Sequence, residues 1–159
     1  MTLEDLGYTK ELEQYRKDQN LDSFEVGRVI SEHKERYIVK TTESEYEGEI
    51  VGNLRFSALN RSDFPAVGDW VAISVFDEKN AIIQKIFPRK TVLERRAVAK
   101  YGEKQILAAN VDYSLIVQAA DRDFNVNRLE RYLTISNSNN IEPIFILSKI
   151  DLINETEIE

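Results

Sequence analysis

Two apolar runs joined by a helical pattern are the feature that most constrains the fold of this 159-residue chain. The runs cover residues 113–120 and 141–147, and Asp123-Phe124-Asn125 between them supplies a helix N-cap signal. After this signal, apolar side chains recur at three- and four-residue spacing. The order predicts a βαβ unit with two parallel strands. Ligands of parallel sheets bind at the carboxyl ends of the strands, so the residues after the second run are the first candidates for a site.

The second run is followed directly by Ser148-Lys149-Ile150-Asp151. This pattern matches the base-recognition motif of GTP-binding proteins, which is usually Asn or Thr, then Lys, any residue and Asp. In that motif the carboxylate accepts two hydrogen bonds from guanine, from N1–H and from the exocyclic amino group. Adenine cannot form this pair. The four residues also allow a plainer interpretation, in which Lys149 is solvated and Asp151 caps the next helix.

Residues 24–88 carry the signals of a small β-barrel. Alternating apolar and polar residues predict strands over 24–31, 36–42, 45–51, 70–76 and 81–87, with a helix-compatible stretch at 54–60. Three strands, a short helix and two strands is the order of the OB-fold, a five-stranded barrel that commonly binds oligonucleotides. An SH3-like barrel fits the same pattern. We expect Trp70 to be a core residue or a plug at the barrel end rather than a platform on which a base stacks.

Residues 1–23 and 89–104 flank the predicted barrel. The first segment has the pattern of a short amphipathic helix or a loosely attached arm, and no chemistry is assigned to it. The second is basic, with Arg89, Lys90, Arg95 and Arg96, and it precedes the βαβ domain at 105–159. It is either a solvated interdomain linker or a segment that contacts RNA phosphates.

Composition excludes several classes of site. The chain has no cysteine and one histidine, so disulfides and thiolate metal sites are excluded and a histidine-based metal site is not expected. No apolar run is long enough to cross a membrane, and the polar start Met1–Asp5 does not resemble a signal peptide, so we expect a cytoplasmic protein. The net charge of −7 argues against general nucleic-acid affinity. An acidic series on one strand, Glu43, Glu45, Glu47 and Glu49, should repel RNA.

The motif of a phosphate-binding loop, Gly-x-x-x-x-Gly-Lys followed by Ser or Thr, does not occur in the sequence. In an ordinary GTPase this loop precedes the guanine motif, whereas here a β-barrel precedes it. Two strands and a helix also cannot close an α/β domain. We therefore expect a permuted order of motifs, with the phosphate loop downstream of a chain that stops within the domain.

The whole sequence resembles the bacterial ribosome-associated, circularly permuted GTPases of the RsgA (YjeQ) family. The resemblance rests on spaced matches in one order: Leu6-Gly7-Tyr8, Glu32-His33 with Arg36-Tyr37, Pro65 to Val71, Ile86 to Arg89, Gln105 to Asp112, Asp123 to Asn125, Leu129 to Leu133, Glu142-Pro143 and Ser148 to Asp151. It implies an OB-fold followed by the first part of a permuted P-loop-type G domain.

The resemblance also implies a function. The intact protein is expected to bind GTP or GDP with Mg²⁺, to hydrolyse GTP, and to act on the 30S subunit and its 16S rRNA in late maturation. By position, Asp151 reads the base and Lys149 packs along it, while Ser148 departs from the commoner Asn and is too short to form all its hydrogen bonds. Zinc is expected only in a C-terminal domain that has no counterpart here, and no cofactor is expected to bind tightly to this chain. The chain alone should not hydrolyse GTP.

Two other functions remain open on the sequence alone. The barrel with its basic segment could be an autonomous RNA-binding module, or the barrel could serve as a protein-interaction domain.

Overall fold

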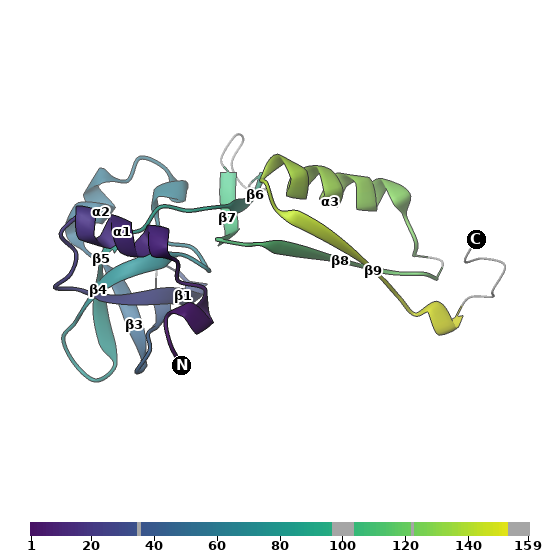
Figure 1. Ribbon diagram of the computed structural model, residues 1–159. Helices are drawn as coiled ribbons and strands as arrows, with labels where there is room; N and C mark the ends of the chain where they lie inside the picture. The colour runs from purple at the N-terminus through teal and green to yellow at the C-terminus, as the bar shows by residue number, and fades with distance from the viewer. Residues whose placement is uncertain (35, 97–103, 122, 153–159) are drawn as a thin grey trace. The chain divides into compact units, whose positions relative to one another are not determined.

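The computed structural model describes residues 1–34, 36–96, 104–121 and 123–152. The chain forms two compact units, Met1–Asn110 and Val111–Glu159 (Figure 1). The division therefore follows Asn110, whereas the sequence suggested a boundary within 89–104. Among the described residues, no helix is long and apolar enough to span a membrane.

The first unit is built around a closed five-stranded barrel with the strand order β1-β2-β3-β5-β4. All its neighbouring strands are antiparallel except β3 and β5, which pair in parallel. The predicted OB-type barrel is thereby confirmed, and each predicted strand and the intervening helix is present within a few residues. The elements are β1 (Glu25–His33), β2 (Arg36–Lys40), β3 (Glu45–Ile50), α2 (Gly52–Ser57), β4 (Trp70–Val75) and β5 (Asn80–Ile86), with the 3-10 helix η2 (Arg61–Asp63) before β4.

Alternation along the strands fills the barrel interior. Side chains of one parity point inward and form a buried cluster of Val29, Tyr37, Val39, Tyr46, Val71, Ile73, Ala81 and Ile83. On β3 the intervening residues Glu45, Glu47 and Glu49 are exposed, so this strand buries one face and solvates the other.

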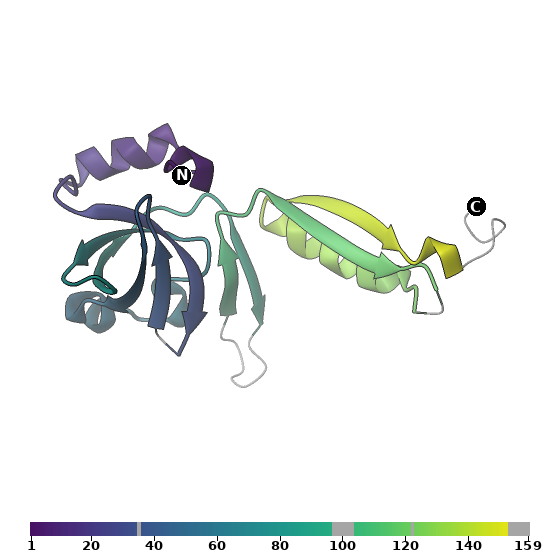
Figure 2. The same ribbon diagram turned by 90° about the horizontal axis from the view of Figure 1, so that it is seen from below.

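The N-terminal segment packs against the outside of the barrel (Figure 2). It contains η1 (Glu4–Leu6) and α1 (Lys10–Asp18), and the Thr9 hydroxyl accepts a hydrogen bond from the backbone N–H of Leu12 as an N-cap. Its apolar side chains cover Trp70, which is 1% exposed and meets Tyr8 edge to face at 4.9 Å between ring centroids. Trp70 is therefore buried, as expected, but it lies between the barrel and the N-terminal segment and not in the barrel interior. The segment is an integral layer rather than a loose arm.

The expected linker, 89–104, contains one strand and the first residue of a second. β6 (Val92–Arg96) and β7 (Lys104–Ala109) pair as an antiparallel hairpin. The end of β7 is fixed to the barrel, because the Ala109 N–H donates to the Val67 carbonyl at 2.8 Å. This contact explains why the hairpin belongs to the barrel unit. Residues 97–103 of the expected linker lie outside the described residues.

The second unit is the predicted βαβ motif. β8 (Tyr113–Ala119) and β9 (Glu142–Ser148) are parallel and in register from Tyr113 with Glu142 to Ala119 with Ser148. Between them α3 (Val126–Ser138) lies along the two strands, as Figure 1 shows. The Asn125 side chain accepts a hydrogen bond from the Arg128 N–H at 3.0 Å, which confirms the predicted N-cap.

The apolar side of α3 is less buried than its sequence pattern suggested. Ser136 is the buried residue of this helix, whereas Val126 and Tyr132 are exposed. Two strands offer too narrow a surface to cover a helix face, and the apolar strand residues Leu115 and Val117 are exposed as well.

Candidate functional site

The predicted base-recognition residues lie at the carboxyl end of β9, where the strand turns away. Ser148 is the last residue of the strand, and its hydroxyl donates to the Gln118 carbonyl oxygen of β8 at 3.3 Å. The Ser148 carbonyl accepts the Ala120 N–H at 2.8 Å. Ser148 is therefore bound to the end of the neighbouring strand, which fixes the point from which the next three residues leave the sheet.

Lys149 makes the turn itself. Its φ of 57° lies in the left-handed region, which is uncommon for a residue with a side chain. Its carbonyl accepts the Leu152 N–H at 3.1 Å and so begins the 3-10 helix η3 (Ile150–Leu152). Backbone held in this region is often found at binding sites, because the surrounding structure must support its cost.

Asp121 lies beside the predicted motif and was not among the predicted residues. One of its carboxylate oxygens pairs with the Lys149 ammonium at 3.2 Å, and the other accepts the Asp123 N–H at 3.1 Å. The Lys149 side chain is 53% exposed and that of Asp121 is 22% exposed. Asp121 thus connects the motif lysine to the turn that leads into α3. The signal available in the sequence was its place just after the first strand, at the same sheet edge as Lys149.

Asp151 and Ile150 lie on η3 and are exposed. Among the described residues, none donates a hydrogen bond to the Asp151 carboxylate, which is exposed. The site thus presents the Asp151 carboxylate and the Lys149 ammonium, which is paired with Asp121, beside the exposed Ile150 side chain. The Asp151 carboxylate can accept both hydrogen bonds from a planar polar ring with two adjacent N–H groups.

Gln118 lies beneath this site on the face of β8 that carries buried Ile116. Its side chain is 6% exposed, and neither its amide nitrogen nor its amide oxygen has a partner among the described residues. An unsatisfied buried amide costs stability, so Gln118 is a weak point of the second unit.

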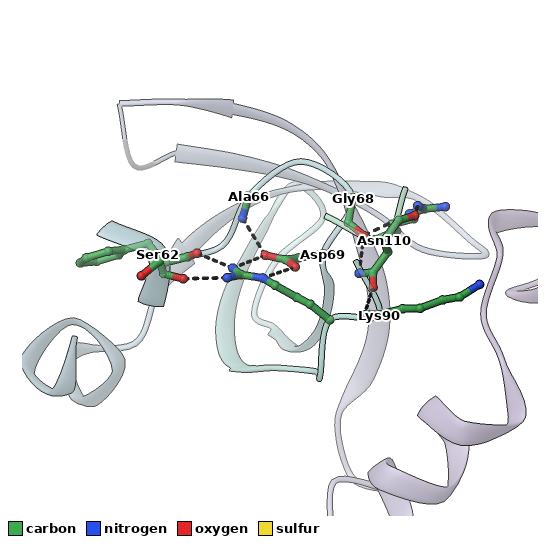
Figure 3. A network of polar contacts seen from close by, with 9 residues as sticks. Ser62, Ala66, Gly68, Asp69, Lys90 and Asn110 are labelled. Atoms are coloured by element: carbon green, nitrogen blue, oxygen red, sulfur yellow. Dashed lines mark hydrogen bonds and ion pairs between the residues drawn. The ribbon is translucent and has the colours of Figure 1, made fainter. Parts of the chain in front are cut away.

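In the basic segment, Arg89 lies in an internal network of the barrel unit with Asp69 and Ser62, which Figure 3 labels. Its guanidinium donates to both carboxylate oxygens of Asp69, at 2.8 and 2.7 Å, and to the carbonyls of Ser62 and Phe64. Asp69 is 0% exposed and also accepts the Ala66 N–H at 2.8 Å. These hydrogen bonds engage four of the five N–H donors of Arg89 and hold the loop before β4.

Lys90 and the end of β7 form the adjoining part of the network in Figure 3. The Asn110 side chain accepts the Lys90 backbone N–H at 2.8 Å and donates to the Gly68 carbonyl at 3.0 Å. Arg28 donates to the carbonyls of Gly68 and Asn110. Asn110, with φ of 55°, is therefore locked to the barrel at the last residue of the first unit.

Arg95 and Arg96 lie on β6 opposite Gln105 and Lys104. Their side chains lie outside the part of the structure that is described. Of the four predicted RNA-contacting residues, Arg89 is bound to Asp69 inside the barrel unit, and Lys90 is exposed. RNA contact at these residues stays a prediction.

A profile of the RsgA GTPase family matches residues 86–159. The chain is 40% identical over 157 residues to the small ribosomal subunit biogenesis GTPase RsgA 2 of Listeria monocytogenes, covering 98% of this chain and 42% of the relative. The protein of the same name from Lactiplantibacillus plantarum is 42% identical over 127 residues, covering 80% of this chain and 36% of the relative. The chain thus spans about two fifths of the length of these relatives.

Two crystal structures share the fold. YloQ, described as a circularly permuted GTPase, superposes with a TM-score of 0.63 at 23% identity, and YjeQ from Thermotoga maritima with 0.65 at 21%. Each match covers 84% of this chain and 44% of the other. The OB-type barrel, the βαβ unit that carries the base-recognition pattern and these relatives lead to one conclusion: the chain belongs to the RsgA family.

Proposed function

We propose that this chain supplies the barrel and the guanine-recognition part of a GTPase that acts in assembly of the small ribosomal subunit. The observation that carries the proposal is the position of Ser148 to Asp151 at the carboxyl end of β9, with Lys149 held by Asp121 and Asp151 exposed. The names of the Listeria and Lactiplantibacillus relatives support the same assignment.

Asp151 would select the base. Its carboxylate accepts hydrogen bonds from N1–H and the exocyclic amino group of guanine, whereas adenine presents an acceptor at N1 and cannot form both. Lys149 would pack its aliphatic stem along the ring and keep its ammonium near the nucleotide. Ser148, which already donates to Gln118 within the sheet, would hold the turn rather than bridge to other nucleotide-binding loops.

Phosphate binding and catalysis would depend on residues outside these 159. The sequence has no Gly-x-x-x-x-Gly-Lys motif to surround the phosphates and no accompanying Ser or Thr for Mg²⁺. Ser148 to Asp151 offer no ligand set for the Mg²⁺ that GTP hydrolysis requires. The expectation of zinc concerns a C-terminal domain and not these residues. We therefore propose that the chain alone recognises guanine weakly and does not hydrolyse GTP.

The proposed partners are the 30S subunit and its 16S rRNA. Co-sedimentation of the chain with 30S subunits at two salt concentrations tests this part, because contacts with phosphate weaken as salt rises. Lys90, Arg95 and Arg96 are the residues of the basic segment to replace. Arg89 is left unchanged, since its loss would disturb the barrel.

The direct test of the nucleotide proposal is an amide-resolved NMR titration of the 159-residue chain with GDP and, as the matched control, ADP. GDP should shift the amide signals of residues 148–152 and of Asp121, and ADP should not. Equal shifts with both nucleotides, or none with GDP, would refute guanine recognition by this segment.

A further inference from the structure

The ion pair between Lys149 and Asp121 joins the ends of the two strands of the second unit. β8 and β9 are in register up to Ala119 opposite Ser148, so the residues that follow them lie at one edge of the sheet. The Lys149 ammonium lies 3.2 Å from an Asp121 carboxylate oxygen. The aliphatic stem of Lys149 therefore runs along this edge, from the end of β9 toward the end of β8.

Asp121 is the more firmly held partner of this pair. Its other carboxylate oxygen accepts the Asp123 N–H at 3.1 Å, and its backbone carbonyl accepts the Phe124 N–H at 2.8 Å. The Asp121 side chain is 22% exposed, against 53% for that of Lys149. The turn thus fixes the carboxylate, and the carboxylate decides where the ammonium lies.

The backbone alone does not place the Lys149 side chain. The left-handed turn at Lys149, with φ of 57°, directs the chain into η3 and so sets the position of Asp151. The flexible lysine stem is fixed separately, and among the described residues Asp121 is the one that pairs with its ammonium. A solvated lysine occupies many rotamers, so a ligand that packs against it must overcome the entropy cost of ordering it.

We propose that Asp121 is a positioning residue for nucleotide binding at Ser148 to Asp151. It acts through Lys149, because the ion pair holds the lysine stem in one place before the ligand arrives. A purine ring then packs on a preformed surface. Base selection stays with Asp151, and Asp121 contributes affinity for each purine nucleotide that the site accepts. The inference rests on the proposed guanine site and adds to it a residue outside the contiguous motif.

The charge of Asp121 gives the inference a distinctive sign. GDP is an anion, and a carboxylate at the edge of its site repels it. If charge alone mattered, replacing Asp121 by asparagine would strengthen GDP binding. Asparagine keeps an oxygen that can accept the Asp123 N–H, but it forms no ion pair with the Lys149 ammonium. Positioning through Lys149 therefore predicts that the same substitution weakens binding.

The test is an NMR titration that measures the affinities of the 159-residue chain for GDP and for xanthosine diphosphate. Asp121→Asn should weaken both by the same factor, roughly 1.5- to 5-fold, the usual effect of a partly exposed ion pair. Asp123→Asn is the matched control, because it removes the same charge from an exposed residue of the same turn, and it should weaken neither nucleotide. Lys149→Met keeps an apolar stem without the ammonium. In this background Asp121→Asn should cause no further loss.

Several results would overturn the role of Asp121 and leave the guanine site standing. These are unchanged or tighter GDP binding by Asp121→Asn, an equal loss in Asp123→Asn, or a further loss in the Lys149→Met background, which would mean that Asp121 acts through its turn. A changed preference between the two nucleotides would mean that Asp121 contacts the base itself. A wild-type chain that does not prefer GDP would instead refute the proposed function, and with it the site on which Asp121 acts.

Discussion

Replacing Arg89 by alanine should destabilise the barrel unit by about 3–5 kcal/mol, the usual cost of removing one partner from a buried ion pair. The structure shows why the cost is high. Asp69 is fully buried, and two of its hydrogen bonds come from the Arg89 guanidinium, at 2.7 and 2.8 Å. Without Arg89 the carboxylate keeps the Ala66 N–H and loses its countercharge, and two carbonyls of the loop before β4 lose their donor.

Urea unfolding followed by Trp70 fluorescence measures this effect. The chain has a single tryptophan, and it is buried in the barrel unit, so the signal reports that unit alone. With an m value of about 2 kcal/mol per molar urea, the midpoint should fall by about 1.5–2.5 M. Arg61→Ala is the matched control. Its ion pair with Glu32 is half exposed, and its loss should cost less than about 1 kcal/mol.

The reasoning would be refuted if Arg89→Ala and Arg61→Ala shifted the midpoint equally. A small loss for Arg89→Ala would mean that Asp69 finds another partner or becomes hydrated when the guanidinium is removed. Arg89→Lys should fall between the wild type and alanine, because one ammonium cannot replace the paired donors of the guanidinium.

Three further predictions concern other parts of the fold. Gly68→Ala should destabilise the barrel by about 2–4 kcal/mol in the same urea assay. Gly68 has φ of +93°, and an added methyl group would collide with the carbonyl of Ala109 at the end of β7. An unchanged midpoint would contradict this prediction. Hydrogen bonds from the Asn80 side chain hold the pKa of Asp77 below its ordinary value. The stability that the ionised Asp77 contributes is therefore present above the ordinary Asp pKa and is lost as pH falls through the lowered value. An NMR titration in which Asn80→Ala leaves the pKa of Asp77 unchanged would show that Asn80 is not the cause. Asp121→Ala and Lys149→Ala should couple by about 0.2–1 kcal/mol in a double-mutant cycle on GDP affinity, and additive effects would show that the ion pair does not matter there.

Local patterns in the sequence were sufficient for most of the secondary structure. Strand alternation and the Asn125 cap are encoded within a few neighbouring residues, so the barrel strands and α3 were predictable. The strands β6, within 89–104, and β7, which begins at Lys104, were not predicted, because they form by pairing with each other. The chain after β7 is fixed by the hydrogen bond from Asn110 to Gly68. A charge pattern alone cannot distinguish a solvated arginine from one that is buried against Asp69.

The site was predictable only in part for a similar reason. Ser148 to Asp151 form a contiguous motif, and their place after an apolar run identifies them. Asp121 lies 28 residues before Lys149 and reaches it only because β8 and β9 are parallel and in register.

The most direct test of the central claim is the nucleotide preference of Asp151→Asn. Xanthine has a carbonyl where guanine has the exocyclic amino group, so an asparagine amide N–H matches xanthine as the carboxylate matches guanine. The wild-type chain should bind GDP more tightly than xanthosine diphosphate, by about 10- to 100-fold if one hydrogen bond to a charged group is at stake, and Asp151→Asn should reverse this preference. If the substitution leaves the preference unchanged, Asp151 does not read the base, and the assignment of this segment as the guanine site is wrong.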